Sequence, residues 1–351
     1  MAIRAMAGLD QLREAVAAAD AVLPAGGHTH WEVGNPPGEG VEVHAPTGVV
    51  AYDPAELTVT VGAGTTVADL AAVLAEAGQE CPLDPRSPTA TVGGTLATGL
   101  SGPRRLRHGP LRDRVLEVRF VTADGRLVKG GGPTVKNVTG YDIPRLLVGS
   151  LGTIGVLVQT TLRCQPKPRT ARWAVTDTDP FDARRRMFRP SCVAWDGRTT
   201  RVLLEGHADD VAAEAAAAGL DLLDADGPDS TAPASPDGMH RGRISVRPSR
   251  LRDLGSALDG VEGLRWLAEV GVGTVHVAAD APDGLVAARR AAVAHDGWLL
   301  RESGAPGVEG YGEPPPNLAI LERIRGAFDP TAKLSPGRLP ISPAPSAAPA
   351  A

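Results

Sequence analysis

The chain has 351 residues, with 36 Lys or Arg against 41 Asp or Glu and a formal net charge of −5. Both signs are spread along the sequence, which argues against a nucleic-acid partner, and no run of about 18 apolar residues is present to span a membrane. The length suits two domains, and the N-terminal residues lack the apolar core of a secretory signal, so a cytoplasmic protein is expected.

The first half is expected to alternate helices and strands, as its apolar periodicity indicates. The expected bounds are a helix over 10–19, a strand over 21–24, a hairpin of 48–52 and 57–61, a helix over 66–77 capped by Thr66, and strands over 115–122 and 153–163. Between them, residues 82–109 are dense in Gly, Pro, Ser and Thr. A loop of that length is typically functional.

The second half shows a different pattern of predicted strands and helices. Residues 202–205, 244–247 and 274–277 are predicted strands, and each precedes an Ala/Leu-rich helical segment. This pattern predicts a layer of sheet and helices, so the expected fold class is α+β. Asn317 is expected to cap a last helix, and residues 341–351, rich in Pro, Ala and Ser, are expected to form a disordered tail.

Three cysteines, Cys81, Cys164 and Cys192, lie far apart in the sequence. They form no Cys-x-x-Cys pair, so a disulfide framework, a zinc site and an iron–sulfur cluster are not expected, and no metal site is predicted. If this protein passes electrons to iron–sulfur centres, a partner chain is expected to carry them.

Two glycine-rich loops carry the first chemical signal. Ala25-Gly-Gly-His-Thr29 follows a predicted buried strand, and Thr89-Ala-Thr-Val-Gly-Gly-Thr95 continues to Gly99-Leu-Ser-Gly102. Successive backbone N–H groups in such turns form a concave site for an anion such as pyrophosphate, although a plain tight turn also explains either loop alone. The usual Gly-x-Gly-x-x-Gly and Gly-x-x-x-x-Gly-Lys-Ser/Thr signatures are absent, so a Rossmann crossover and a P-loop are disfavoured.

Several of these motifs together resemble the vanillyl-alcohol-oxidase or PCMH-type flavoproteins. They are Pro88 to Gly94, Ser101-Gly-Pro-Arg104, His108-Gly109, Arg112-Asp113, Val135 to Asp142, Gly149 to Gly155 and the C-terminal Phe328 to Arg338. Within that family, residues 101–142 most resemble glycolate oxidase E subunits.

The resemblance implies a two-part FAD-binding domain and a small α+β cap. The implied bounds are 1–170 for the PCMH-type FAD-binding domain, 171–315 for a reduced substrate-side cap, 316–340 for a helix returning to the FAD domain, and 341–351 for the tail. The cofactor implied is FAD. Carried over by position, the FAD-binding residues would be Ala25, Gly26, Gly27, His28, Thr29, Pro88, Thr91, Val92, Gly93, Gly94, Thr95, Gly99, Ser101, Gly102, His108, Gly109, Gly152, Thr153, Gly155 and Val156.

The chain departs from the family's pattern in the first loop. Some relatives with Gly-Gly-His-Ser there bond the flavin covalently through the histidine, whereas E-subunit relatives commonly have glycine at the position of His28. We therefore expect His28 to line the site without a covalent bond. Ser335 also stands where many relatives have Asn.

The cap is expected to hold the substrate chemistry. Glu269-Val-Gly-Val-Gly-Thr-Val-His276 keeps the glycines and the second histidine of a family motif but lacks the first, which argues against a metal. His276 is the candidate catalytic base, with a structural role facing the sheet as the alternative. Arg243 and Arg247 are candidates for a substrate carboxylate or a solvated strand edge. Arg104, Arg105 and Arg107 would offset phosphate charge, dock a partner or simply be solvated.

The resemblance implies an FAD-binding subunit of a glycolate oxidase or dehydrogenase complex. Such a subunit would oxidise a small 2-hydroxy acid by hydride transfer to flavin, and a D-type flavin subunit and an iron–sulfur subunit would be its partners. Two alternatives remain open at this point: an accessory flavin subunit without turnover, and a stand-alone FAD oxidase of another small alcohol.

Overall fold

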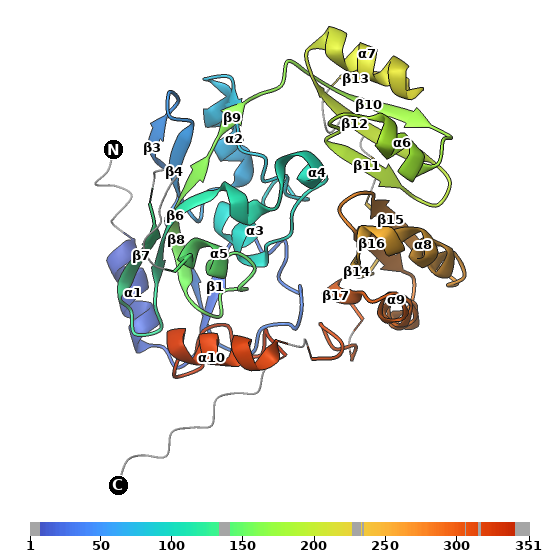
Figure 1. Cartoon of the computed structure of the whole chain (residues 1–351). Helices are drawn as coiled ribbons and strands as arrows, with labels where there is room; N and C mark the ends of the chain where they lie inside the picture. The colour runs from blue at the N-terminus through green and yellow to red at the C-terminus, as the bar shows by residue number, and fades with distance from the viewer. Residues whose placement is uncertain are drawn as a thin grey trace.

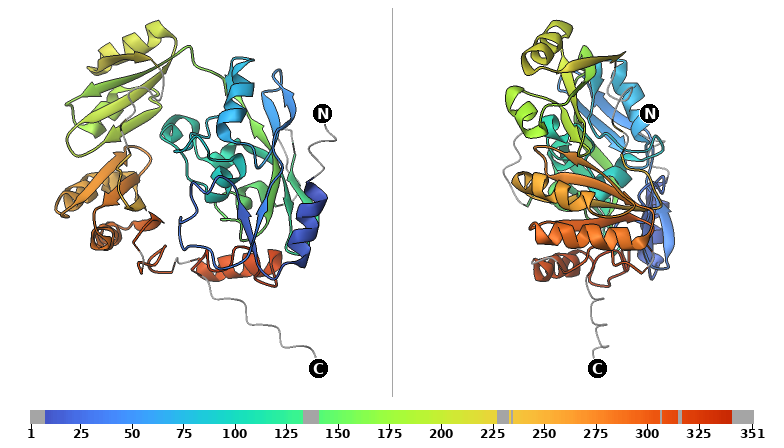
Figure 2. Two further views of the ribbon diagram at one scale, coloured as in Figure 1. Left: turned by 180° about the vertical axis from the view of Figure 1, so that it is seen from behind. Right: turned by 90° about the vertical axis from the view of Figure 1, so that its right-hand side faces the viewer.

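The computed structural model describes residues 8–132, 141–226, 233, 235–305, 307–314 and 317–340. The predicted tail, and most of the Val135 to Asp142 motif, lie outside these residues. The chain forms two lobes that lie side by side, and the last helix returns to the first of them (Figures 1 and 2). Helices and strands are both present in quantity, which confirms the predicted α+β class.

The first lobe is built on a five-stranded antiparallel sheet. Its strands, in spatial order, are β3 (Val49–Asp53), β4 (Thr58–Gly62), β8 (Val156–Arg163), β6 (Val115–Val121) and β7 (Leu127–Gly131). Helices α2 (Val67–Ala75), α3 (Val92–Thr98) and α5 (Ile143–Leu147) contribute to a single core with this sheet, through buried residues such as Leu70, Leu96 and Leu147. Thr66 caps α2 as predicted, because its side chain accepts a hydrogen bond from the Asp69 N–H.

A smaller part of the first lobe holds the N-terminal elements. Helix α1 (Leu9–Ala18) packs beside the parallel pair β1 (Val22–Ala25) and β2 (Val41–His44) through Leu12, Val16 and Val22. The short elements β5 (Gln79–Glu80), α4 (Arg105–His108), η1 (Leu111–Arg114) and β9 (Gln165–Pro166) complete the lobe. Residues 82–109 are therefore only partly loop, since both α3 and α4 lie within them.

The second lobe, which we call the cap, is an eight-stranded sheet. The spatial order is β13 (Asp221–Asp226), β10 (Thr170–Thr176), β12 (Thr200–Gly206), β11 (Cys192–Trp195), β15 (Leu264–Glu269), β16 (Thr274–Ala279), β14 (His240–Ser245) and β17 (Trp298–Ser303). Helices α6 (Pro180–Arg186), α7 (Ala208–Ala218), α8 (Leu251–Asp259) and α9 (Pro282–Ala294), with the one-turn η2 (Pro248–Arg250), cover the face turned away from the first lobe (Figures 1 and 2). The other face is left to meet the first lobe.

The C-terminal segment closes the first lobe. Helix α10 (Leu318–Phe328) lies beneath it in Figure 1, and the chain then bridges to β1. The Val22 N–H donates to the Lys333 carbonyl at 2.8 Å, and the Ser335 N–H donates to the Val22 carbonyl at 2.8 Å. Asn317 occupies the N-cap position of α10, and the helix ends at Phe328 as predicted, but the Asn317 side chain makes no capping hydrogen bond.

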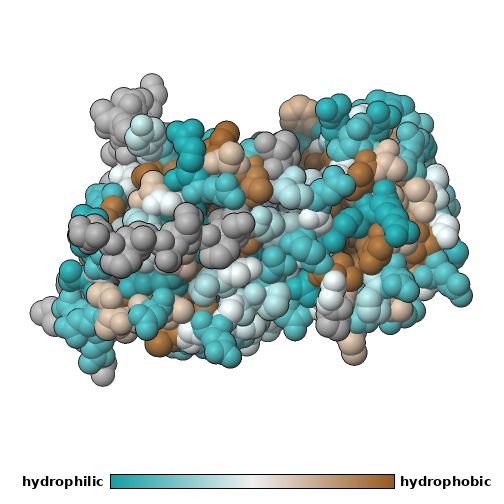
Figure 3. Space-filling view, turned by 90° about the horizontal axis from the view of Figure 1, so that it is seen from below, coloured by the Kyte–Doolittle hydropathy of each residue, from teal (hydrophilic) through white to brown (hydrophobic). Residues whose placement is uncertain are grey.

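The face seen from below is mainly hydrophilic. Hydrophobic residues appear there in small groups between hydrophilic ones, across both lobes (Figure 3). Small scattered apolar groups are normal on a protein surface.

Candidate functional site

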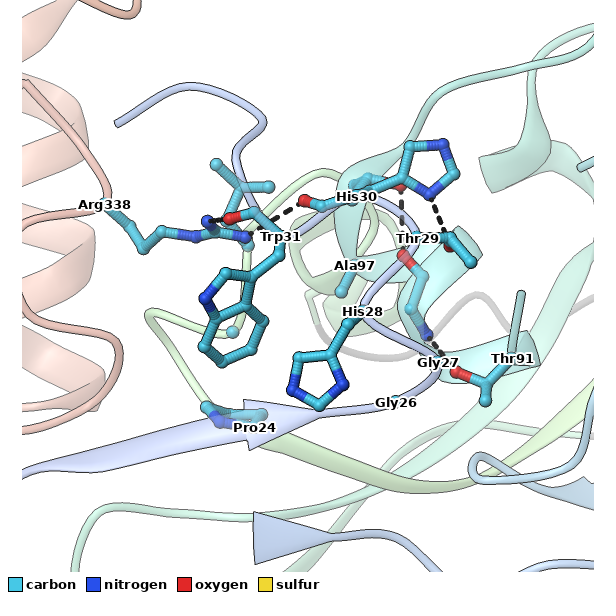
Figure 4. Close-up of a pocket in the computed structure, with 14 residues that line it drawn as sticks. Pro24, Gly26, Gly27, His28, Thr29, His30, Trp31, Thr91, Ala97 and Arg338 are labelled. Atoms are coloured by element: carbon cyan, nitrogen blue, oxygen red, sulfur yellow. Dashed lines mark hydrogen bonds between the residues drawn. The ribbon is translucent and has the colours of Figure 1, made fainter. Parts of the chain in front are cut away.

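Three cavities line up along the first lobe and share wall residues. The loop cavity, of about 480 Å³, is lined by both glycine-rich loops together with Trp31, Leu151 and Arg338 (Figure 4). The sheet cavity, of about 460 Å³, shares Gly26, Thr91 and Gly94 with it and extends towards Val156 and Leu157. The interlobe cavity, of about 860 Å³, shares Thr98 and Leu151 with the loop cavity and reaches the cap. Together they suit an elongated ligand.

The first glycine-rich loop presents free backbone donors. Among the described residues, no acceptor takes a hydrogen bond from the N–H groups of Gly27, His28 or Thr29, all of which line the loop cavity. A Cβ on Gly27 would lie 2.1 Å from the Thr89 carbonyl oxygen, so only glycine fits where the two loops meet. Such a run of unpaired donors is a fitting cradle for a pyrophosphate.

The second loop is shaped differently. At the start of α3, the Gly94 and Thr95 N–H groups donate to the side chain and carbonyl of Thr91, and the Gly93 N–H donates to the Ala63 carbonyl. These donors are therefore already used by the protein. The loop contributes small side chains and a close wall rather than free N–H groups.

Arg338 supplies the positive charge of the loop cavity. Its guanidinium donates to the carbonyls of His30, Trp31 and Asn35 and stacks over the Trp31 ring, with 5.8 Å from Cζ to the ring centroid (Figure 4). No carboxylate among the described residues forms an ion pair with it. Burial lowers its pKa, but an arginine remains charged at neutral pH. It is thus placed to offset a phosphate charge, a role that the sequence reasoning missed.

Most predicted cofactor residues line these cavities. They are Ala25, Gly26, Gly27, His28, Thr29, Thr91, Gly93, Gly94, Gly99, Ser101, Gly152, Gly155 and Val156. Seven others line none of the three: Pro88, Val92, Thr95, Gly102, His108, Gly109 and Thr153. Val92, Thr95 and Thr153 are buried in the lobe, and Pro88 is exposed. The role of these seven in binding FAD stays a prediction, with one exception that also contacts the cap.

The exception is His108, which faces the cap. Its Nε2 lies 3.4 Å from Glu205 Oε2, and Glu205 also accepts from Arg104 Nη1 at 3.1 Å. Arg104 pairs further with Asp84 at 2.6 Å and with Glu80 at 2.9 Å. The sequence had suggested that Arg104 offsets phosphate charge, docks a partner or is solvated. Arg104 is instead buried, so it neither faces a phosphate nor offers a docking surface. This Arg104 cluster joins α4 to the cap sheet.

The pKa of Glu205 reflects the hydrogen bonds and charges that surround its carboxylate in the Arg104 cluster. Burial alone raises the pKa of a carboxyl group. Here the contact with His108, the charge of Arg104 and a hydrogen bond from Ser191 outweigh burial and hold the pKa of Glu205 at about 2. The carboxylate is therefore ionised throughout the physiological range.

His276 lies in a second cluster between the lobes, in which the histidine and two glutamates are buried and the arginine is exposed. The Nε2 atom of His276 is 2.9 Å from Glu269 Oε1, and its Nδ1 contacts Nη2 of Arg86. The same guanidinium pairs through Nη1 with Glu302 at 2.5 Å. Because Arg86 can only donate, Nδ1 must accept and Nε2 must donate to Glu269. Both ring nitrogens are engaged, and His276 lines none of the three cavities. This geometry favours the structural alternative; the catalytic base role stays a prediction without support here.

The interlobe cavity is lined by arginines from both lobes. Arg105 and Arg112 come from the first lobe next to Ser101, and Arg243 comes from β14 of the cap. The Arg243 side chain makes no hydrogen bond or ion pair to a described residue, and its Nε is buried. The Tyr311 hydroxyl in the same cavity is also buried without a partner, and burial raises its pKa, so it stays a neutral donor. Arg247, the other predicted carboxylate ligand, does not line the cavity.

Comparisons with known proteins agree with this geometry. Residues 3–131 match the family described as FAD binding domain. The chain is 39% identical over 166 residues to the glycolate oxidase subunit GlcE of Escherichia coli (strain K12), a match covering 46% of this chain and 47% of that protein. It is 44% identical to D-lactate dehydrogenase of Archaeoglobus fulgidus, over 31% of this chain and 24% of that one. The glycolate oxidase subunit GlcD of Bacillus subtilis is 34% identical over 38% and 29% of the two chains.

These matches have a limited span, since each covers less than half of the relative's own length. The solved structure of alkyldihydroxyacetonephosphate synthase superposes with a TM-score of 0.66 at 14% identity, covering 94% of this chain and 73% of that chain. At that identity the likeness shows the fold alone. No helix among the described residues is long and apolar enough to cross a membrane.

The resemblance stated from the motifs is confirmed by the matching family and by the relatives. The loop and sheet cavities fit the cofactor, because unpaired N–H groups and Arg338 are gathered where a pyrophosphate needs them. Residues 3–131 thus match the FAD binding domain family and resemble the PCMH-type flavoproteins, and FAD is the cofactor of this domain.

Proposed function

We propose that this chain is the FAD-binding subunit of an enzyme complex of the glycolate oxidase type, which oxidises a 2-hydroxy acid. The observation that carries the proposal is the position of the interlobe cavity. It adjoins the FAD site through Thr98 and Leu151, and it presents a half-buried arginine, Arg243, with unused donors. The printed names of the relatives, glycolate oxidase subunits and D-lactate dehydrogenases, support the same reaction class.

The residues of the chain would divide the work between holding the cofactor and orienting the acid. The first loop and Arg338 would bind the pyrophosphate, and Gly99 and Ser101 would line the ring side. Bound FAD would supply the acceptor for the hydride on C2 of the acid, and the hydroxyl proton would pass to a base. Arg243 would bind the substrate carboxylate by charge-assisted hydrogen bonds, and the Tyr311 hydroxyl would donate a further one.

The Arg104 cluster and the His276 cluster would fix the position of the two lobes relative to each other around this cavity. Arg104 from the first lobe pairs with Glu205 of the cap, and Arg86 pairs with Glu302. Holding the acid and the cofactor in one geometry lowers the entropic part of the barrier. In the proposal, electrons then leave towards a D-type flavin subunit and an iron–sulfur subunit.

The test is a visible spectrum of the FAD-loaded chain under anaerobic conditions, before and after glycolate or D-lactate is added. Dye reduction is then measured with and without the D-type and iron–sulfur subunits. We expect slow bleaching by the chain alone and faster dye reduction in the complex. No bleaching in either setting would support an accessory flavin subunit, and full turnover with peroxide production by the chain alone would support a stand-alone oxidase.

A further inference from the structure

A buried carboxylate of the cap, Glu302, is paired with an arginine of the first lobe. Only 4% of the Glu302 side chain is exposed, and its Oε2 accepts a hydrogen bond from Nη1 of Arg86 at 2.5 Å. Burial raises the pKa of this carboxyl group, but the charges of Arg86, His276 and Arg243 outweigh burial and lower it. Glu302 is therefore ionised at neutral pH, and a buried carboxylate is strongly destabilising unless a cation stays beside it.

A second arginine lies near Glu302 without touching it. Arg243 on β14 is in register with Leu300 on β17, and Glu302 follows Leu300 by two residues. Leu300 and Glu302 both contact the first lobe, through Val33 and Arg86, so they share one face of the sheet with Arg243. Among the described residues, no ion pair or hydrogen bond joins Arg243 to Glu302.

Both groups keep an unsatisfied atom in this position. Oε1 of Glu302 and Nε of Arg243 are buried, and neither has a hydrogen-bond partner among the described residues. An arginine donor and a carboxylate acceptor attract each other strongly where water is scarce. The Arg243 guanidinium would therefore satisfy Glu302 if that carboxylate were not already taken.

Arg86 takes the carboxylate first. Its Nη1 holds Oε2 of Glu302, and its Nη2 contacts Nδ1 of His276, so two contacts fix one guanidinium on the cap. Without Arg86, Arg243 is the other arginine whose charge acts on Glu302. A move of Arg243 onto Glu302 would withdraw its donors from the interlobe cavity that it lines.

We propose that Arg86 is a positioning residue: by occupying Glu302, it leaves the Arg243 guanidinium free to bind a carboxylate in the interlobe cavity. That the ligand is a carboxylic acid rests on the function proposed above, whereas the competition of two arginines for Glu302 rests on the contacts between the lobes. Because Arg86 comes from the first lobe, the acid-binding group of the cap is available only while the two lobes are in contact.

The test measures the binding of butyrate, a non-reacting monocarboxylate, to the FAD-loaded full chain by calorimetry. Arg243→Gln should weaken binding, and Arg86→Met should weaken it by at least about tenfold, the loss expected for one charge-assisted contact. Flavin content and thermal unfolding confirm that each variant is folded. Unchanged affinity in either variant would overturn the inference; for Arg86→Met it would mean that His276 or water serves Glu302 instead.

A double variant separates positioning from a merely structural role. Glu302→Gln removes the charge that would attract Arg243, so the Arg86→Met/Glu302→Gln chain should regain the butyrate affinity of the wild type. Arg86→Lys keeps a cation on Glu302 and should also retain most of it. Arg126→Met, which breaks the exposed pair with Asp124, changes net charge equally and should have no effect. Failure of Glu302→Gln to restore binding would overturn the inference, because Arg86 would then act by some route other than Glu302.

Anaerobic flavin reduction by glycolate or D-lactate tests the proposed function independently. Butyrate affinity that is lost in Arg86→Met and regained in the double variant, without flavin reduction by either acid, supports the inference and removes the proposed reaction. Flavin reduction in the wild type with unchanged butyrate affinity in Arg86→Met does the reverse.

Discussion

The two lobes face the same line of cavities with walls of different chemistry. The first lobe lines the loop cavity mainly with backbone and small residues, in which the N–H groups of Gly27, His28 and Thr29 are free donors. The cap lines the interlobe cavity with large side chains such as Arg243, Trp298 and Leu300. Where backbone lines a cavity, ligand binding depends on how closely the ligand can approach it. Where side chains line a cavity, binding depends on their charge and on the groups that fix each side chain in place.

This difference predicts how each wall fails. An added methyl group should damage the backbone wall, and the loss of a charge should do little there. At the contact between the lobes, the loss of one charge should cost much, because its partners stay buried. The following changes test these expectations, from the largest effect to the smallest.

Gly27→Ala should abolish FAD binding, with at least a hundredfold loss of affinity. The new Cβ would lie 2.1 Å from the Thr89 carbonyl oxygen, and a backbone atom cannot move aside without displacing the second loop. Flavin content after purification and a titration followed by flavin fluorescence measure the effect. Gly326→Ala in α10, where the new Cβ would meet nothing within 4 Å beyond the backbone of its own helix, is the matched control and should bind FAD normally. Normal affinity in Gly27→Ala would remove the close-approach argument.

Arg104→Met should lower the free energy of unfolding by about 3–5 kcal/mol, because it leaves buried carboxylates without their cation. Glu205 has only 1% of its side chain exposed, so water cannot replace the guanidinium there. Urea unfolding followed by circular dichroism measures the change. Arg126→Met breaks the exposed pair with Asp124 and should cost at most about 1 kcal/mol. Similar losses in both variants would mean that the Arg104 cluster is no tighter than a surface pair.

The same cluster predicts acid sensitivity of the interlobe contact. The pKa of Glu205 is held at about 2, below its ordinary value of 4.5. A carboxyl group with a depressed folded pKa stabilises the fold above its ordinary pKa, and that stability is lost as the pH falls from about 4.5 towards 2. Urea midpoints at stepped pH should therefore fall more steeply for the wild type than for Glu205→Gln. Parallel curves for the two proteins would show that Glu205 does not couple folding to pH.

The glycine-rich loops that line the loop cavity could be predicted from the sequence, whereas the charged residues of the cap could not. Gly26, Gly27, Gly93 and Gly94 stand in two short continuous segments, so local composition is enough to mark them. The family's resemblance added FAD and the two-lobe expectation. The motifs also named Thr95 and Thr153, which are buried and line none of the three cavities, so their part in binding FAD stays a prediction.

The charged cap wall is assembled from strands far apart in the chain. Arg243 on β14 pairs in register with His276 on β16, while Arg86 comes from the first lobe. Only the tertiary fold brings these groups together, so spacing along the sequence carried no signal for Arg86 or Glu302. The role of Arg338 was hidden for the same reason, since it lies more than 300 positions from the carbonyls that it contacts.

His28→Gly should change FAD binding least, although His28 is the neighbour of Gly27. The residue has a φ of 54°, a region that glycine adopts without strain, so the substitution preserves the loop and its N–H donor. The ring is 45% exposed, packs against Trp31 with 4.6 Å between centroids, and lies 3.1 Å from Glu42 Oε2. The Nε2 atom of His28 already has Glu42 as a partner, and the loop cavity is lined by the backbone N–H of this residue. We therefore expect FAD to be bound without a covalent link and His28→Gly to keep most of it. Acid precipitation checks the prediction: yellow colour retained in the pellet, with an intact-mass increase equal to FAD that His28→Gly removes, would show instead that the side chain is the attachment point.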